Sequence, residues 1–262
     1  MKEIKRFLQT RNGEYSFYFE EISSGYSYGI DENKQMPAAS CIKVPIAMAL
    51  LHAVESEKVD LKESVMVKKE DMVSGRGIIH EFSERTYLIE ELLMAMLMQN
   101  DNTAANKIMD ILEFEYINLC IQDMGLKNTS VNRKMMDMDA VKNEFDNYSS
   151  SYDLSRCFKL LLNRGYLNDM HCEYLIDTLK KQRNKSKIPF YIPEEEKKSI
   201  ANKAGSLEGI ENDSSIIMIP KGNFLFTVMS KNLQNNVYGI VTIARAAKMM
   251  WDIINSSWEY ED

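Results

Sequence analysis

A serine and a lysine three residues apart are the first candidates for chemistry in this sequence. Ser40 and Lys43 stand at the start of an apolar run from Ile42 to Val54. A run of this length predicts a mostly buried helix, on which residues three apart share a face. An ammonium among apolar neighbours is expensive to bury, so Lys43 should have a lowered pKa or a proton-accepting neighbour. That environment suits a lysine that activates a serine nucleophile.

The same spacing also has a purely structural explanation. Ser40 can cap the helix while the stem of Lys43 runs along the surface toward water. The adjacent Cys41 offers a third interpretation, in which its thiol is the reactive group. Cys41 lies one step around the helix from Ser40 and should face the core, so we expect a buried thiol.

Two further polar segments occur at expected helix starts or strand ends. The first, Asn100-Asp101-Asn102, follows the apolar segment Ile89 to Gln99 and precedes another helical pattern. The second, Lys203-Ala204-Gly205-Ser206, ends a predicted strand. Taken singly, Asn102 could be only a helix cap and Lys203 a surface lysine at a strand end.

The elements that must position these groups are strands at both ends of the chain and helices between them. The alternating residues of 14–22, followed by 26–30, predict a β-hairpin. Three more strands are expected near the other end, at 201–205, 216–219 and 224–230, before a final helix at 237–254. Helical patterns occupy 114–124, 152–162 and 169–181, and a polar loop spans 128–151.

This order predicts an α+β fold with an antiparallel sheet built from both chain ends and flanked by helices. We expect a single domain over 1–262. Its sheet subdomain would comprise 1–38 and 199–262, and its all-helical subdomain 39–198.

Composition excludes several classes of partner. The 262 residues carry a net charge of −7, which argues against nucleic acid or an anionic membrane surface. No segment approaches a membrane span, and the basic N-terminus has no apolar stretch behind it. We therefore expect a cytoplasmic protein as written, or a secreted one if an export signal was removed. A monomer is expected.

No metal or organic cofactor is indicated by the metal-binding residue types. The cysteines Cys41, Cys120, Cys157 and Cys172 have no ligand spacing, and we expect mostly buried thiols. The histidines His52, His80 and His171 share no ligand spacing either.

The three polar segments, in this order, resemble the Ser-x-x-Lys, Ser-Asp-Asn and Lys-Thr-Gly series of class A β-lactamases and penicillin-binding proteins. The flanks agree, since 99–106 is similar to the context of the second motif. Residues 202–213 with Pro220-Lys221-Gly222 are similar to the third motif and its hairpin. The resemblance covers nearly the whole chain, and it implies a serine acyltransferase fold with its site between the sheet and the helices.

The resemblance also implies roles for individual residues. Ser40 would be the nucleophile, and Lys43 would accept its proton directly or through a water. The backbone N–H groups of Ser40 and Ser206 would hold the oxyanion. Lys203 would supply positive charge for a substrate carboxylate, and Gly205 of the same motif would also belong to the substrate-binding residues. Asn102 would bind the substrate amide or Lys43, and Asp101 would hold the loop geometry.

Three residues depart from the family pattern. Asn100 stands where the family has a serine that relays a proton to the leaving nitrogen, which an amide cannot do. Ala204 replaces the threonine or serine whose hydroxyl helps to bind the substrate carboxylate. Met135 falls at the position of the deacylating glutamate and cannot activate water. We therefore predict slow hydrolysis of a lactam-derived acyl-enzyme.

The long polar loop should still be ordered. Arg133 keeps the place of the family's loop-pinning arginine, with Asp137 or Asp146 as its expected partner. Asp139 and Glu144 are candidates for a substitute base, although acidic residues in polar loops are usually solvated.

Two functions follow from this interpretation. The first is a serine hydrolase that a β-lactam or a related amide, ester or peptide-like substrate acylates at Ser40, with weak or absent β-lactamase turnover. The alternative is a binding module that keeps the fold, has lost the chemistry, and holds a peptidoglycan fragment or a protein partner.

Overall fold

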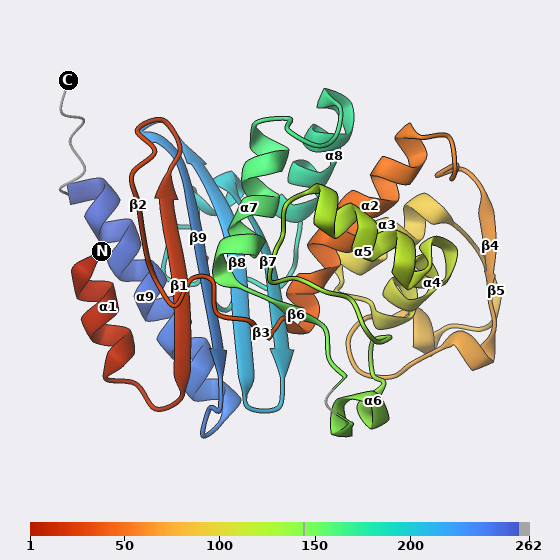
Figure 1. Ribbon diagram of the computed structural model, residues 1–262, viewed down its shortest axis with the longest axis horizontal. Helices are drawn as coiled ribbons and strands as arrows, with labels where there is room; N and C mark the ends of the chain where they lie inside the picture. Colours follow the sequence, from red (N-terminus) through yellow and green to blue (C-terminus); the bar gives the residue numbers. More distant parts are fainter. Residues whose placement is uncertain (144, 257–262) are drawn as a thin grey trace.

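An antiparallel sheet forms one side of the molecule (Figure 1). The computed structural model describes residues 1–143 and 145–256. The strands of this sheet lie in the order β2-β1-β9-β8-β7. Their bounds are β1 Glu14–Glu21, β2 Ser27–Ile30, β7 Ile200–Leu207, β8 Ile210–Ile219 and β9 Gly222–Lys231. Because β1 pairs directly with β9, the two ends of the chain build one sheet, which confirms the predicted α+β fold.

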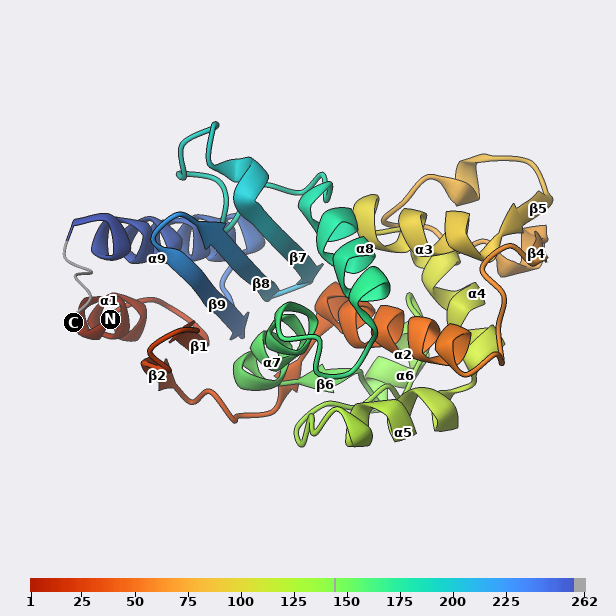
Figure 2. The same cartoon turned by 90° about the horizontal axis from the view of Figure 1, so that it is seen from above.

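Successive residues of the central strands serve two different hydrophobic cores. Phe224 and Phe226 pack with residues of α1 (Lys2–Gln9) and α9 (Asn236–Ser256), whereas Leu225 between them joins the core of the other helices. This alternation follows from the two-residue period of a strand. Figure 2 shows α1 and α9 side by side on one face of the sheet. The remaining helices lie beyond the opposite face.

These remaining helices surround α2, which is buried along nearly its whole length. Their bounds are α2 Lys43–Glu55, α3 Ile89–Met98, α4 Asn102–Leu112, α5 Phe114–Asp123, α6 Met138–Lys142, α7 Ser151–Leu162 and α8 Asp169–Lys180. The apolar run after Ser40 therefore forms the mostly buried helix that was predicted for it. Helix α7 packs against β8 and β9, so it joins the helical side to the sheet.

Several short elements were not predicted from the sequence. They are β3 Met36–Pro37 paired with β6 Tyr148–Ser149, β4 Ser64–Val67 paired with β5 Arg85–Leu88, and the 3-10 helices η1 Ala39–Ile42, η2 Lys69–Asp71, η3 Ile79–Glu81 and η4 Lys197–Ser199. The segment 128–151, predicted as a loop, includes β6 and α6. Within the described ranges, no helix has the length and apolar character that crossing a bilayer requires. The subdomain boundaries after 38 and 198 stay predictions.

Candidate active site

Ser40 lies in the short helix η1, immediately before α2. The preceding Ala39 has a φ of +47°, a strained conformation for a residue with a side chain, of the kind that structures retain at functional sites. Ser40 is 8% exposed and lines a cavity of about 300 Å³ together with Asn102, Met135 and Ser206. The N-cap of α2 is Ile42, so the interpretation of Ser40 as the cap of this helix is wrong.

Lys43 is fully buried and points away from solvent, so the interpretation of a lysine reaching to water is also wrong. Its Nζ donates to Asn100 O at 2.7 Å, to Asn100 Oδ1 at 3.0 Å and to Asn102 Oδ1 at 2.9 Å. All three acceptors are neutral amide oxygens, and no carboxylate among the described residues forms an ion pair with Lys43. Burial, and then the nearby Lys203 ammonium, holds the pKa of Lys43 well below its ordinary value, against the opposing effect of Asp101.

Asn100 connects the two lysines of the site. Its Oδ1 accepts from Lys43 Nζ and also from Lys203 Nζ, the latter at 2.7 Å. The residue has a φ of +59°, in the left-handed region that asparagine tolerates better than most residues. Asn100 therefore brings two amines to one oxygen, an arrangement that disfavours two positive charges.

Lys203 comes from β7 and is fully buried, so it is not the surface lysine considered as the alternative. It also donates to the carbonyl of Ala204 at 2.9 Å. Burial is the largest influence on Lys203 and lowers its pKa to about 8. At neutral pH, Lys203 is therefore mostly protonated.

Asp101 has a structural role, because its carboxylate fixes a loop by hydrogen bonds and is not used to carry a proton. Its Oδ1 caps α4 through the N–H of Ala104, and its Oδ2 accepts from the N–H groups of Ile78 and Ile79 at 2.7 and 2.9 Å. Gly77 lies so close that an added Cβ would be 2.1 Å from Asp101 Oδ2, at a φ of +107°. The cap of α4 is thus Asp101, and the interpretation of Asn102 as a cap is wrong.

Gly205 allows β7 to approach the backbone around Ser40. A Cβ at this position would lie 2.7 Å from Ser40 N and 2.9 Å from Cys41 N. Both neighbours are backbone atoms of the short helix that carries the serine, so they cannot move aside. A side chain at 205 would push β7, and with it Ser206, away from Ser40.

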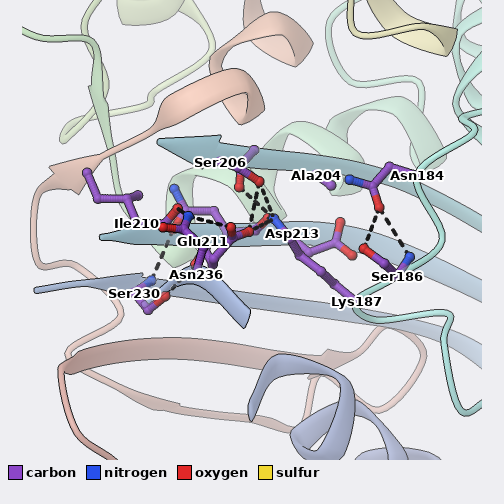
Figure 3. A network of polar contacts seen from close by, with 12 residues as sticks. Asn184, Ser186, Lys187, Ala204, Ser206, Ile210, Glu211, Asp213, Ser230 and Asn236 are labelled. Carbon is purple, nitrogen blue, oxygen red and sulfur yellow. Dashed lines mark hydrogen bonds and ion pairs between the residues drawn. The ribbon is translucent and has the colours of Figure 1, made fainter. Parts of the chain in front are cut away.

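A buried ion pair lies directly behind Ser206, and the sequence analysis missed it (Figure 3). Lys187 Nζ contacts Glu211 Oε2 at 2.5 Å and donates to the carbonyls of Gly205 and Asn212 at 2.6 and 2.8 Å. Ser206 Oγ donates to the same Glu211 oxygen at 2.8 Å. The pair therefore fixes both the main chain of the third motif and the hydroxyl of Ser206.

The loop that carries Met135 is pinned in place. Arg133 forms a buried ion pair with Asp146 at 2.7 Å, so Asp146 and not Asp137 is its partner. The side-chain amide of Asn106 accepts from Met135 N at 2.7 Å and donates to Met135 O at 3.1 Å. Met135 is 7% exposed and faces the Ser40 cavity. A thioether stands there and no carboxylate.

Of the two candidate substitute bases, the structure describes only Asp139. Asp139 has 88% of its side chain exposed and pairs with Lys142. Asp139 is absent from the residues that line the cavity, so the structure gives it no role in deacylation. Glu144 lies outside the described residues.

Cys41 has the opposite character from a reactive thiol. It is fully buried, its Sγ donates to Lys203 O at 3.1 Å, and burial raises its pKa to about 12. The other three cysteines are also buried and free, as predicted. In the part of the chain that the structure describes, no group of histidine, cysteine or acidic side chains is arranged to hold a metal ion.

The structure thus brings Ser40, Lys43, Asn100, Asn102, Lys203, Gly205 and Ser206 together, although they come from three distant parts of the sequence. The arrangement can support nucleophilic attack by a hydroxyl whose proton passes to a buried amine.

Comparison with known proteins gives a consistent result. The profile of the Beta-lactamase enzyme family matches residues 1–254. The extended-spectrum β-lactamase PER-1 of Pseudomonas aeruginosa is 21% identical, over 76% of this chain and 68% of its own. The β-lactamase SME-1 of Serratia marcescens is 25% identical over 42% of this chain. The chain spans only 37% and 45% of the length of the first two curated relatives that it matches.

Solved structures show the same fold. A β-lactamase from Sphaerobacter thermophilus is similar with a TM-score of 0.89 and 22% identity, over 97% of both chains. A variant of the protein PBP-A, solved as an acyl-enzyme with penicillin G, gives a TM-score of 0.87 and 24% identity, over 97% of this chain and 95% of that one.

Proposed function

Because the chain belongs to the β-lactamase enzyme family, we propose that it is a serine hydrolase acylated at Ser40 by a β-lactam or a related amide or ester, with weak or absent β-lactamase turnover. The observation that carries the proposal is the buried Lys43, whose amine has only neutral hydrogen-bond partners, one of which, Asn102, lines the cavity of Ser40. A lysine with a strongly lowered pKa is a base at neutral pH.

Acylation would proceed by attack of Ser40 Oγ on the substrate carbonyl. Lys43 takes the hydroxyl proton as the new C–O bond forms. The developing oxyanion is held by the backbone N–H groups of Ser40 and Ser206, which typically contribute about 3 kcal/mol per donor to transition-state stabilisation. Lys203 provides the positive charge for a carboxylate on the substrate, and Asn102 binds the substrate amide.

The leaving nitrogen needs a proton when the C–N bond breaks. Asn100 cannot relay one, because a neutral amide is too weak both as an acid and as a base to pass a proton on as a hydroxyl does. Lys203, which shares the Asn100 oxygen with Lys43 and has a pKa of about 8, is the nearest available acid. We assign proton delivery to the two lysines, without an intervening hydroxyl.

Deacylation lacks its base. The side chain of Met135 occupies the wall of the cavity where a carboxylate would be needed to activate water. We therefore expect the acyl-enzyme to accumulate. A penicillin G acyl-enzyme has been solved for a PBP-A variant of the same fold.

Intact-protein mass spectrometry after incubation with a penicillin tests this function. The expected result is a long-lived adduct on the parent protein and none on Ser40→Ala, a loss of at least about a thousandfold in acylation rate. A parent protein that forms no adduct with penicillins, cephalosporins or fluorophosphonates would contradict the proposal.

A binding module for a peptidoglycan fragment or a protein partner is the second candidate, favoured by Asn100, Ala204 and Met135. It requires that Ser40→Ala keeps the parent's affinity for a peptidoglycan fragment in calorimetric titration. A large loss of affinity in that variant would count against it.

A further inference from the structure

A second cavity adjoins the one that contains Ser40. It has a volume of about 340 Å³ and shares Arg76 and Ser206 with its neighbour. Asn100, Arg183 and Ser186 line it as well, while Met98 and Ile240 supply apolar surface. The two cavities differ in position: the first extends toward Met135, and the second lies on the side of Asn100 and the Lys187–Glu211 pair.

The second cavity carries positive charge that nothing balances. Among the described residues, neither the Arg76 nor the Arg183 guanidinium forms an ion pair, and the lining contains no acidic side chain. The Lys203 ammonium, which donates to the side-chain oxygen of the lining residue Asn100, adds a further positive charge next to the cavity. Glu211, which accepts from the lining residue Ser206, is buried and paired with Lys187. Asp101, next to Asn100, accepts from the backbone N–H groups of Ile78, Ile79 and Ala104.

Both arginines stand on main chain that is already fixed. The carbonyl of Arg76 accepts from Asn102 N at 3.0 Å, and Arg183 N donates to Met98 O at 3.2 Å. Gln182, buried beside Arg183, donates to Asn202 O and accepts from Asn184 N. Binding an anion would therefore order only the arginine side chains, which keeps the entropic cost low.

We propose that the second cavity binds an additional anionic group on the leaving-group side of the substrate, so that the preferred acyl donor carries two negative charges beyond its scissile bond. Lys203 takes the first, and Arg76 with Arg183 takes the second. This inference rests on the proposed acylation of Ser40. The side follows from the proposed function, in which the lysine pair at Asn100 protonates the leaving nitrogen: Asn100 lines the second cavity and accepts from Lys203, whereas Met135 lines only the first.

Two thioesters with the same acyl group test the charge requirement. Phenylacetylglycyl thioesters of mercaptosuccinate and of mercaptoacetate leave an identical acyl group on Ser40, and their leaving thiols differ by one carboxylate. In each reaction, the C–O bond to Ser40 forms, the C–S bond breaks, and the thiolate leaves with the bonding electron pair. The Ser40 proton passes to Lys43. The adduct masses are equal, so mass spectrometry compares the two acylation rate constants directly.

The mercaptosuccinate ester should acylate about tenfold faster, since charge-assisted guanidinium–carboxylate contacts are strong. Arg183→Gln and Arg76→Gln should each reduce this ratio. Lys181→Gln is the matched control, because it removes an equal charge two residues from Arg183 at a position outside the cavity. A ratio near one, or a ratio that all three variants leave unchanged, would overturn the inference.

Binding without chemistry separates the two proposals. Calorimetry on Ser40→Ala should show tighter binding of methylthiosuccinate than of methylthioacetate, and Arg183→Gln should abolish the difference. If this holds but neither thioester nor penicillin acylates the parent, the anion site stands and the hydrolase proposal fails. If penicillin acylates the parent but the dianion shows no preference in either assay, the hydrolase proposal stands and this inference fails.

Discussion

The two sides of the Ser40 site are built very differently. On one side, the buried amines of Lys43 and Lys203 meet amide oxygens within hydrogen-bonding distance, and Asn102, a partner of Lys43, lines the Ser40 cavity. On the other side, the main chain of the loop around Met135 is held as firmly, but the side chain of Met135 itself is apolar. We call these sides the acylating wall and the Met135 wall; under the proposed function, the first would form the acyl-enzyme and the second would lack the base that hydrolyses it.

This comparison shows that a loop can be held rigidly at the active site without carrying a catalytic base. The Arg133–Asp146 pair and the Asn106 amide keep the Met135 loop in place although it lacks a base. Both charges of this buried pair are needed together, because leaving either one unpaired in the interior would be costly. Substitutions confined to one wall should therefore affect either acylation or the Met135 loop.

Replacing the base on the acylating wall should have the largest effect. Lys43→Met removes the amine and keeps a chain of similar length, and we expect acylation by penicillin to slow by about a thousandfold, within the range for loss of a positioned general base. Stopped-flow or timed mass spectrometry measures the rate. An unchanged rate would show that Lys43 is not the base, provided that circular dichroism confirms folding.

Removing the buried ion pair that holds the Met135 loop should have a smaller effect than replacing Lys43. Arg133→Met leaves the Asp146 carboxylate buried and unpaired, which we expect to lower the free energy of unfolding by about 3 kcal/mol. Urea denaturation measures this change. The exposed Lys142→Met, whose ion pair with Asp139 lies in solvent, is the control and should change stability by less than about 1 kcal/mol.

Restoring a carboxylate to the loop would remove the contrast between the walls. Met135→Glu should shorten the lifetime of the penicillin adduct by about tenfold or more, since a positioned base can then activate water. Met138→Glu, on the same loop and exposed, is the control and should leave the lifetime unchanged. An equal effect of both variants would show that charge alone, and not position, accelerates hydrolysis.

The smallest effect is the pH dependence of the acylating wall. Lys203 is protonated below its pKa of about 8 and loses its charge as pH rises through that value. The acylation rate with a carboxylate-bearing lactam should therefore fall by about twofold at pH 8 and further above it. Rate measurements from pH 6 to 10 test this. In Lys203→Arg the decline should vanish, because guanidinium keeps its proton, and for the same reason the rate should be lower at every pH, since the leaving nitrogen loses one of its proton donors.

The sequence predicted which residues would meet, because three short motifs in a fixed order carry that information without any structure. It also indicated the paired chain ends and the central buried helix, since strand alternation and a long apolar run are strong signals.

The supporting contacts had no such signal. Lys187 lies in a charged connection between 180 and 198, whose composition suggests a solvated segment, yet it is fully buried against Glu211. Likewise, Asn106 lies in the segment that resembles the second motif, but nothing in the sequence marks it as the residue that holds Met135, because the two are 29 positions apart. Tertiary contact alone creates these roles.

The Asn106 contact has a consequence for how such proteins diversify. The Asn106 amide bonds only to the main chain of residue 135, so these contacts do not depend on which side chain stands at that position. Selection can therefore exchange the residue at this position without rebuilding its surroundings. A lineage with this arrangement can pass between a long-lived acyl-enzyme and rapid turnover through local change, while the scaffold around it is inherited intact.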